Sequence, residues 1–335
     1  MNLKPAADIK FFTQTAKRYG ICNKSERLRL FFDFIYCKQR FHCKLSEYFE
    51  YDYFKYKNRY RKYFLTSYTR RSAYLLINRA KFTESKLFCY ELLKKYYSRK
   101  IFGLDKLGKE GFVQFLRESK TVVLKPDKGS YGIGVESLSY TCDEDACRKY
   151  DELYGKDSIC EEFIRQHETV SKLCPTSVNS CRIMTLLDGG KTKIIAATLK
   201  MSKGANFVDN MRSDGIGANV DLSTGVIVSC GKDFEGNRFI FHPLTGVCIP
   251  GTQLPFWQEA LYIVSEAHKQ IPECSILGWD IAFTQTGVDI VEVNSAPGSK
   301  IHQFIDKKPK GKPIFEFVAK KENRRYKIKN NNYEM

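Results

Sequence analysis

Three oxygen-bearing side chains in the last quarter of the chain have types and spacing that suit a site for a hard divalent cation. In the run LGWDIAFTQTGVDIVEVNSAPG, Asp280 lies in one apolar segment, and Glu292 and Asn294 lie in the next. Side chains two apart on a strand point the same way, and a turn near residue 287 would fold the first segment beside them. Such ligands, without thiol or imidazole, favour Mg²⁺ with phosphate oxygens completing its shell. The alternative is an outward-facing polar stripe, which would also place Val288 and Ile290 on the solvent side.

A glycine-rich segment follows a lysine that closes an apolar run. Lys125 lies in the run 122–126, and a buried ammonium is costly unless an anion meets it. The glycines of the next segment, GSYGIG, allow backbone N–H groups to close over phosphate. The candidate loop residues are Gly129, Ser130, Tyr131, Gly132 and Gly134. The loop is neither a Walker A motif nor a GxGxxG motif. An ordinary hairpin turn is the alternative.

A third segment could contact the base and ribose of a nucleotide. Glu161, Phe163 and Ile164 leave an apolar run, and Glu168 comes a turn later. Backbone at such a segment can meet an adenine edge, while a carboxylate holds ribose hydroxyls. The alternative is a solvated linker.

Three cations lie between these segments. Arg182 and Lys200 each interrupt an apolar run, and Arg212 lies in DNMRSDGIG. A single one could be an edge residue whose charged head reaches water. Several in one sheet, beside a carboxylate cluster, better fit a triphosphate held between cations and metal.

The elements that would position these residues change in character near residue 120. Residues 1–120 have few Gly or Pro residues and apolar positions three or four apart, which predicts amphipathic helices. One of them has Thr83 as its capping candidate. From residue 121 short strands are predicted at 121–126, 132–140, 160–164, 181–190, 192–202, 225–230 and 238–243, before the pair that carries the carboxylates. Hairpin turns are expected at 189–190 and 286–287, and a helix at 254–271.

Composition excludes several classes of protein. With 335 residues, 43% hydrophobic and 28% charged, the chain is ordinary for a soluble protein of two domains. No stretch reaches the roughly 20 apolar residues of a membrane span, and the first residues lack a secretory signal. We therefore expect a cytoplasmic protein. The 12 cysteines have neither CxxC nor zinc spacing, which predicts reduced and mostly buried thiols.

The net charge of +17 is concentrated in the first third of the chain. Residues 1–120 hold 28 Lys and Arg against 11 Asp and Glu, whereas the remainder is balanced. This region can be a solvated surface, or it can dock on an anionic membrane face or an acidic sugar chain. Nucleic-acid binding is a rival interpretation, but no RNP-like motif, zinc finger or helix-turn-helix signature supports it. Nucleic acid is therefore not an expected partner.

Taken in order, the segments resemble the ATP-grasp superfamily and, more narrowly, the sugar-transfer-associated ATP-grasp proteins. The resemblance is carried by VVLKPDKGSYGIGV, CEEFI, SVNSCRIMTL, FVDNMRSDGIGANVDLSTG and GWDIAF…VDIVEVNSAPG, from residue 122 to about 303. It implies an α+β ATP-grasp fold, in which two α+β subdomains hold ATP between antiparallel sheets, preceded by a mostly helical, basic region. The implied domains are 1–118 for the helical region, 119–320 for the ATP-grasp domain and 321–335 for a basic, polar tail.

The resemblance also implies how the nucleotide is held. Lys125 would bind the α- and β-phosphates, and the loop 129–134 would close over the β- and γ-phosphates. Glu161 and the backbone near Phe163 and Ile164 would meet adenine, with Glu168 on the ribose.

The implied reaction is ATP-dependent joining of a carboxylate to an amine through an acyl-phosphate, in surface-polysaccharide biosynthesis. Lys200 would lie along the nucleotide, and Arg182 and Arg212 would stabilise the γ-phosphate and the acyl-phosphate. The three oxygen ligands in 280–294 would hold two Mg²⁺ ions. The expected substrates are ATP, a carboxylate such as a sugar acid, and an amine such as an amino acid. A non-catalytic scaffold and phosphotransfer to another acceptor are the alternatives.

Overall fold

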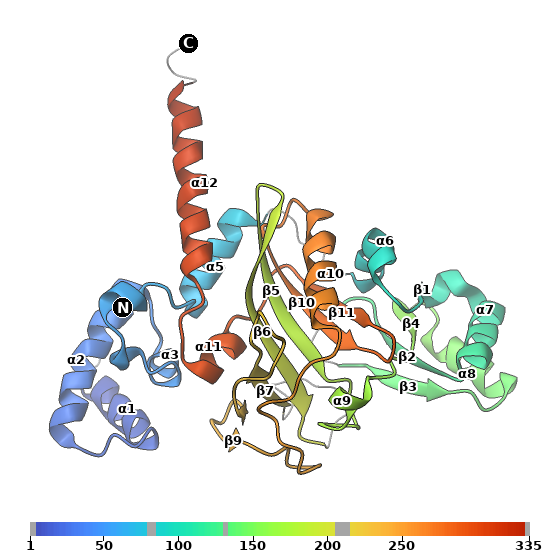
Figure 1. Ribbon diagram of the computed structural model, residues 1–335, viewed down its shortest axis with the longest axis horizontal. Helices are drawn as coiled ribbons and strands as arrows, with labels where there is room; N and C mark the ends of the chain where they lie inside the picture. The colour runs from blue at the N-terminus through green and yellow to red at the C-terminus, as the bar shows by residue number, and fades with distance from the viewer. Residues whose placement is uncertain (1–4, 79–84, 130–132, 205–214, 332–335) are drawn as a thin grey trace. The chain divides into compact units, whose positions relative to one another are not determined.

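The computed structural model describes residues 5–78, 85–129, 133–204 and 215–331 (Figure 1). Contacts divide the chain into two compact units, one formed by 1–77 with 298–335 and the other by 78–297. The stretch 78–118 thus packs with the second unit, and 298–320 with the first. These units are defined by packing, whereas the boundaries at 118 and 320 rest on composition and resemblance and stay a prediction.

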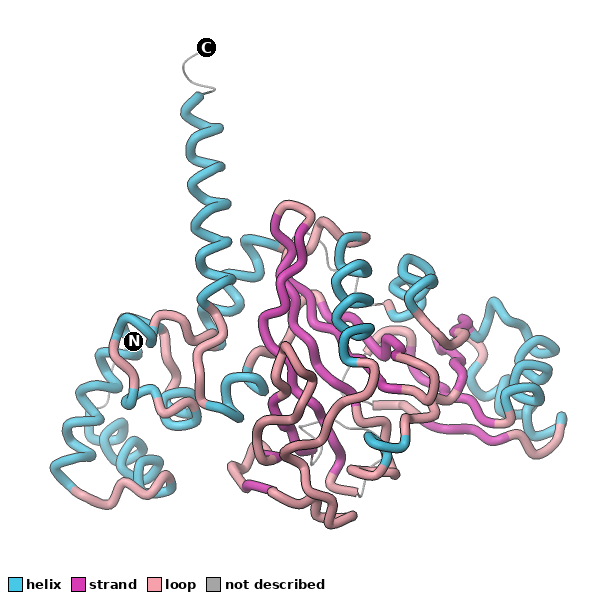
Figure 2. Tube along the Cα trace, in the orientation of Figure 1, coloured by secondary structure: helices cyan, strands magenta, loops and turns pink. Residues whose placement is uncertain are grey.

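The first unit is helical, as the sequence predicts for most of its length (Figure 2). Its elements are α1 (Pro5–Arg18), α2 (Lys24–Phe41), α3 (Leu45–Glu50), η1 (Tyr53–Lys55), α4 (Asn58–Arg61), α5 (Ser67–Ile77), α11 (Lys300–Asp306) and α12 (Lys312–Asn331). Aromatic side chains fill its interior, where Tyr48, Phe49 and Tyr53 are fully buried. Phe12 packs against Phe49 with ring centres 5.5 Å apart. The run 45–71 therefore contributes aromatic side chains to the core and basic side chains to the surface. In the described part of the chain, no helix has the length and hydropathy needed to cross a membrane.

The second unit begins with a small antiparallel sheet in the order β1-β4-β2-β3. Its strands are β1 (Ile101–Gly103), β2 (Thr121–Pro126), β3 (Glu136–Ser139) and β4 (Ser158–Glu162), preceded by α6 (Lys86–Leu93) and η3 (Lys94–Tyr96). The helices α7 (Leu104–Ser119) and α8 (Asp143–Leu153) pack on it through Phe112, Leu116 and Tyr150. β2 is an inner strand, with β4 on one side and β3 on the other. The backbone near its end therefore holds Lys125 in a fixed position.

A seven-stranded antiparallel sheet forms the rest of the second unit, in the order β11-β10-β5-β6-β7-β8-β9. Its strands are β5 (Ser180–Asp188), β6 (Lys191–Ser202), β7 (Gly215–Asn219), β8 (Gly231–Lys232), β9 (Arg238–Phe239), β10 (Ile276–Phe283) and β11 (Val288–Asn294). The helix α10 (Trp257–Lys269) covers one face and packs Trp257 and Val264 into the core, while the short α9 (Glu168–Ser171) follows β4 (Figure 1).

Both predicted hairpin turns are confirmed. Gly189 and Gly190 join β5 to β6 with φ of 59° and 79°, a backbone that glycine adopts without steric cost. Residues 284–287 join β10 to β11, and the Thr284 N–H donates to the Gly287 carbonyl at 2.8 Å.

Three predicted strands are shorter than expected, one of which, predicted at 132–140, is reduced to β3. The segment 225–230 makes only isolated bridges, and 238–243 yields the two-residue β9 with a bridge at Phe241. Local bonds replace the ladder here, because the Asp221 carboxylate accepts from the backbone N–H groups of Ser223 and Thr224. The capping candidate Thr83 lies outside the described residues, and α6 is capped by Ser85.

His268 on α10 is buried and links three elements. Its Nδ1 lies 2.7 Å from Thr185 Oγ1, and its Nε2 lies 2.9 Å from the Cys274 carbonyl oxygen. Burial lowers the pKa of His268 from 6.5 to about 4. As the pH falls below 6.5, His268 becomes protonated in the unfolded chain, whereas in the folded protein it stays neutral until near pH 4. The free energy of unfolding therefore decreases across this pH range.

We expect this one group to reduce the free energy of unfolding by roughly 3 kcal/mol between neutral pH and the lower end of the window. His268→Gln should remove most of that acid sensitivity. Chemical denaturation of both proteins at about pH 7.5 and about pH 4.5 measures the difference. An unchanged pH dependence in the variant would contradict the assignment.

Candidate functional site

The predicted hairpin brings the carboxylates together. Asp280 on β10 pairs directly with Glu292 on β11, and Gly278 pairs with Asn294. The three predicted oxygen ligands thus occupy neighbouring positions on two adjacent strands. This is the geometry that the spacing predicts.

A β-bulge explains how the same strands also build the core. The register shifts so that Asp280 faces Glu292 while Ile281 faces Ile290, which leaves Val291 as the extra residue. Ile281 and Ile290 belong to the core cluster, whereas Asp280 and Glu292 are not part of it. The expectation that a solvent-facing polar stripe would also place Ile290 on the solvent side is therefore wrong, because the strict alternation of side chains fails at the bulge.

Two of the predicted cations contact Asp280 from the neighbouring strands. Arg182 on β5 pairs with Asp280 in the ladder, and its Nε and Nη2 donate to the two carboxylate oxygens, the latter at 2.6 Å. Lys200 on β6 donates to the same carboxylate at 3.2 Å. Although burial alone would raise the pKa of Asp280, these two charges lower it, so the carboxylate stays ionised. Arg212 lies outside the described residues.

Glu292 and Asn294 have unmet polar groups. No described residue makes a hydrogen bond to the Glu292 side chain, and burial together with the Asp280 charge raises its pKa. The Asn294 amide nitrogen is buried and has no hydrogen-bond partner within the described ranges.

This donor set fits Mg²⁺. A divalent cation would relieve the repulsion between the Asp280 and Glu292 carboxylates, and all the donors are hard oxygens. Among the described residues, no group of three or more His, Cys, Asp or Glu side chains could hold a metal. The candidate site therefore depends on two carboxylates, one amide and the oxygens of a ligand. The presence of two ions stays a prediction.

Lys125 belongs to a buried chain of ion pairs that joins the two sheets. Its Nζ lies 2.8 Å from Glu161, whose other oxygen lies 3.0 Å from Arg99. Arg99 also contacts Asp289 of β11 at 2.8 Å and donates to the Ile290 carbonyl at 2.7 Å. Burial lowers the pKa of Lys125, although the negative charge of Glu161 acts in the opposite direction. Burial alone would raise the pKa of Glu161, but the positive charges of Arg99 and Lys125 lower it. The network thus fixes Lys125 relative to β11.

The glycine-rich loop starts beside a second lysine. Lys86 at the start of α6 donates from Nζ to the carbonyls of Pro126, Asp127 and Gly129 at 3.1–3.2 Å. At the far end of the loop Gly134 has φ +74°, and a Cβ there would lie 3.1 Å from the Pro126 ring. The loop residues Ser130, Tyr131 and Gly132 lie outside the described residues.

One cavity of about 10 Å³, space for about one water molecule, lies among these features. Lys86 and Lys125 line it from the side of the small sheet, and Glu292 with its strand neighbours lines it from β11. The structure therefore places the predicted phosphate-binding lysine and a predicted metal ligand on one cavity. Lys86 and Arg99 were not predicted from the sequence, because each lies in a basic stretch, predicted to be helical, where nothing distinguishes it from its neighbours.

The profile of the sugar-transfer-associated ATP-grasp family matches residues 62–309. The chain belongs to this family. The predicted family and the α+β ATP-grasp fold are confirmed, with the small and the large antiparallel sheets as its two halves.

Solved structures with a similar fold include other ATP-grasp proteins. The ATP-grasp ligase PsnB in complex with a minimal precursor is 11% identical, with a TM-score of 0.46 over 73% of this chain and 64% of that chain. PsnB with a phosphomimetic precursor variant, Mg and ADP is also 11% identical, with a TM-score of 0.45 over 72% and 60%. D-alanyl-alanine synthetase A from Vibrio cholerae is 10% identical, with a TM-score of 0.41 over 66% and 58%. This ATP-grasp chain thus spans less than two thirds of the length of each. No curated protein sequence matches it significantly.

The remaining candidates of this ATP-grasp chain lie where β4 ends. The strand stops at Glu162, so Phe163 and Ile164 belong to the segment after it, and Ile164 is buried. Glu168 opens α9 and lies 3.7 Å from Lys172, with both side chains largely exposed. The roles of Phe163, Ile164 and Glu168 at adenine and ribose stay predictions.

Proposed function

We propose that this protein is an ATP- and Mg²⁺-dependent ligase that joins a carboxylate to an amine through an acyl-phosphate. The observation that carries the proposal is the meeting of Lys86, Lys125 and Glu292 on one pocket, next to the pair formed by Asp280 and Glu292. A nucleotide's phosphates need cations on one side and metal ligands on the other. Membership of the ATP-grasp family agrees with this arrangement.

The chain's own residues would act by positioning and by neutralising charge. Lys125 would hold the α- and β-phosphates and Lys200 would lie along the nucleotide, while Arg182 and Arg212 would stabilise the γ-phosphate and the acyl-phosphate. The substrate carboxylate oxygen attacks the γ-phosphorus, the bond to the β-phosphate oxygen breaks, and ADP leaves. The amine nitrogen then attacks the acyl carbon, the new C–N bond forms, and phosphate and a proton leave. Mg²⁺ held by Asp280, Glu292 and Asn294 would supply Lewis-acid stabilisation of the phosphate charge.

For the substrates we propose a sugar acid as carboxylate and an amino acid as amine, in surface-polysaccharide biosynthesis at the cytoplasmic side of the membrane. The sugar-transfer association of the family supports this choice.

Trapping with hydroxylamine tests the ligase proposal. The protein with ATP, Mg²⁺, D-glucuronate and hydroxylamine should release ADP and form a hydroxamate, because hydroxylamine intercepts an acyl-phosphate. Panels of sugar acids and amino acids then define the pair. ADP release with phosphate transferred to a hydroxyl group would replace the ligase with a phosphotransferase. ATP binding without ADP release would leave a non-catalytic nucleotide-binding scaffold, and absence of ATP binding would refute the proposal altogether.

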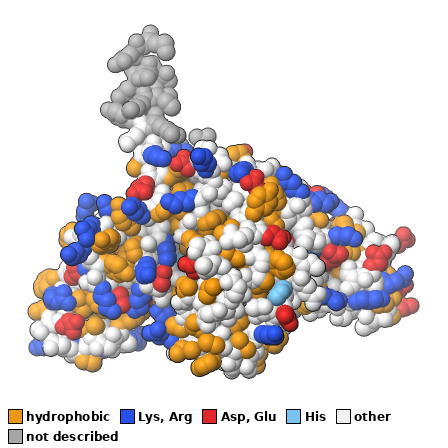
Figure 3. All heavy atoms as spheres, in the orientation of Figure 1, with side chains coloured by type: hydrophobic (Ala, Val, Ile, Leu, Met, Phe, Trp, Pro, Cys, Tyr) orange, Lys and Arg blue, Asp and Glu red, His pale blue; other side chains and the backbone are white. Residues whose placement is uncertain are grey.

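The helices α1 and α2 support a further proposal, that the first unit docks on an anionic membrane face. Phe11 and Phe32 are each 63% exposed, and Lys17 and Arg18 close α1. Figure 3 shows basic and hydrophobic side chains interspersed over these helices. Apolar residues among cations are typical of helices that lie in the membrane interface.

We expect the protein to sediment with vesicles that contain phosphatidylglycerol, and less so as salt increases, since each basic residue near the surface adds about 1 kcal/mol. Replacing Phe11 and Phe32 by Ser should weaken vesicle binding. Vesicle binding that changes neither with the salt concentration nor with this double substitution would refute docking on the membrane. Binding to an acidic glycan but not to vesicles would show that the basic region of the first unit docks on a sugar chain instead.

A further inference from the structure

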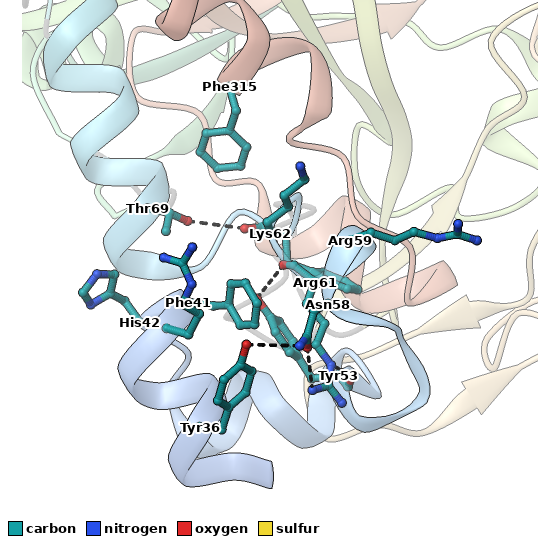
Figure 4. A pocket seen from close by; sticks show the side chains of 12 residues that line it. Tyr36, Phe41, His42, Tyr53, Asn58, Arg59, Arg61, Lys62, Thr69 and Phe315 are labelled. Atoms are coloured by element: carbon teal, nitrogen blue, oxygen red, sulfur yellow. Dashed lines mark hydrogen bonds between the residues drawn. The ribbon is translucent and has the colours of Figure 1, made fainter.

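The first unit contains a pocket of about 410 Å³, lined by none of the residues assigned to the nucleotide (Figure 4). Its volume lies within the roughly 300–1,000 Å³ of small-molecule sites. Its walls come from the end of α2, the segment 53–64, α5 and the first turn of α12. All of these elements belong to one compact unit, so the pocket does not depend on how the two units are placed.

The charge of the pocket is positive and is not neutralised by its own walls. Its lining contains Arg40, Lys62 and Arg61, together with Arg59 at the edge, and no acidic side chain. Arg61 is buried and already binds Asp33 with both guanidinium nitrogens, at 2.7 and 2.9 Å. Arg40 and Lys62 are exposed and have no acidic partner among the described residues. Their charges are therefore available to an anion; Figure 4 shows the Lys62 side chain rising beside Phe315, and its Nζ lies 4.9 Å from the centre of the Tyr63 ring.

The rest of the lining suits a polar ring rather than a bare ion. Aromatic side chains from separate elements, Phe41 and Phe315, present apolar surface to the space, and a compact inorganic anion would leave them unused. Asn58 donates to the Tyr36 hydroxyl oxygen at 3.1 Å, which leaves the Tyr36 O–H free to donate to a ligand hydroxyl. Apolar faces for ring C–H groups, a phenol for a hydroxyl, and cations for an acidic substituent together describe a site for an acidic sugar.

We propose that this pocket binds a ring sugar that carries one carboxylate or phosphate group. The carboxylate or phosphate would lie between Arg40 and Lys62, where charge-assisted hydrogen bonds are strongest. The sugar ring would lie against Phe41 and Phe315. The proposal stands apart from the ligase reaction, and its failure would leave that reaction untouched.

Calorimetric titration of the full-length protein tests the proposal with four probes. D-glucuronate and glucose 1-phosphate are the acidic sugars and separate a carboxylate from a phosphate. Glucose lacks the charge, and inorganic sulfate lacks the ring. We expect at least one acidic sugar to bind at least tenfold more tightly than either glucose or sulfate. Sulfate binding as tightly as the acidic sugars, or no binding of either acidic sugar, would overturn the proposal.

Substitutions locate the binding. Arg40→Ala and Lys62→Ala should each weaken binding of the acidic sugar about tenfold, while Lys38→Ala should not change it, because Lys38 is an exposed cation of α2 that does not line the pocket. Unchanged unfolding temperatures and unchanged ATP binding in all three variants would show that the fold is intact. Acidic-sugar binding that survives both pocket substitutions would place the ligand elsewhere and refute the assignment.

Discussion

Replacing Glu292 by Ala or Gln should abolish ATP turnover while leaving the fold intact or more stable. The carboxylate is partly buried, has no hydrogen-bond partner among the described residues, and lies beside the ionised Asp280, so without a cation it destabilises the folded protein. As a predicted metal ligand it is indispensable, and we expect Mg²⁺-dependent ADP release to fall by about 10²–10³-fold or more.

The decisive measurement combines stability with activity. Without Mg²⁺, Glu292→Gln should unfold at the same temperature as the wild type or at a higher one. Adding Mg²⁺ and ATP should raise the unfolding temperature of the wild type and leave that of the variant unchanged, since only a folded state that binds the ligand gains stability from it. Glu273→Ala, which removes an exposed carboxylate, is the control and should behave as wild type. ADP release near the wild-type rate in Glu292→Ala would end the metal assignment.

Arg99→Met should be the most destabilising single substitution in the second unit that we can name. It would leave Glu161 and Asp289 buried without their common partner, and the Ile290 carbonyl without its donor. Removing one member of a buried ion pair costs about 3–5 kcal/mol. For a unit of this size the unfolding temperature should fall by roughly 6–20 °C, which differential scanning calorimetry would detect.

Two further variants separate burial from charge. Arg148→Met removes a guanidinium that pairs with Asp145 at 2.8 Å but is largely exposed, and should not change the unfolding temperature measurably. Arg99→Lys keeps the charge but cannot bridge both carboxylates, so it should lie between wild type and Arg99→Met. If Arg99→Met has the same unfolding temperature as the wild type, the network does not hold the two sheets together.

The carboxylate hairpin could be predicted from the sequence because every part of it is local. The turn at 286–287, the apolar runs on each side and the acidic residues within them lie in one stretch of about 20 residues, and the structure pairs Asp280 with Glu292 as the spacing indicates. The bulge at Val291 could not be predicted, since it carries no sequence signature and only the packing of Ile290 shows it.

The ion-pair network lay beyond sequence reasoning for a different reason. Arg99, Glu161 and Asp289 come from three distant segments, and in each the charged residue looks like a solvated one. Only tertiary structure shows that they are buried together. Similarly, periodicity predicts the helices of residues 1–120, but it does not show that α6 and α7 pack with the second unit.

The extra residue at Val291 also decides which way the two halves of β11 face. Upstream of it the strand shows Ile290 to the apolar interior, and downstream it shows Glu292 to the ligand side. Asp280 and Ile281 are consecutive on β10 and point to opposite faces, so their partners Glu292 and Ile290 do the same although they are two apart in sequence. A one-residue slip in the pairing of either half would turn that half to the wrong side. The bulge thus lets one seven-residue strand serve two environments.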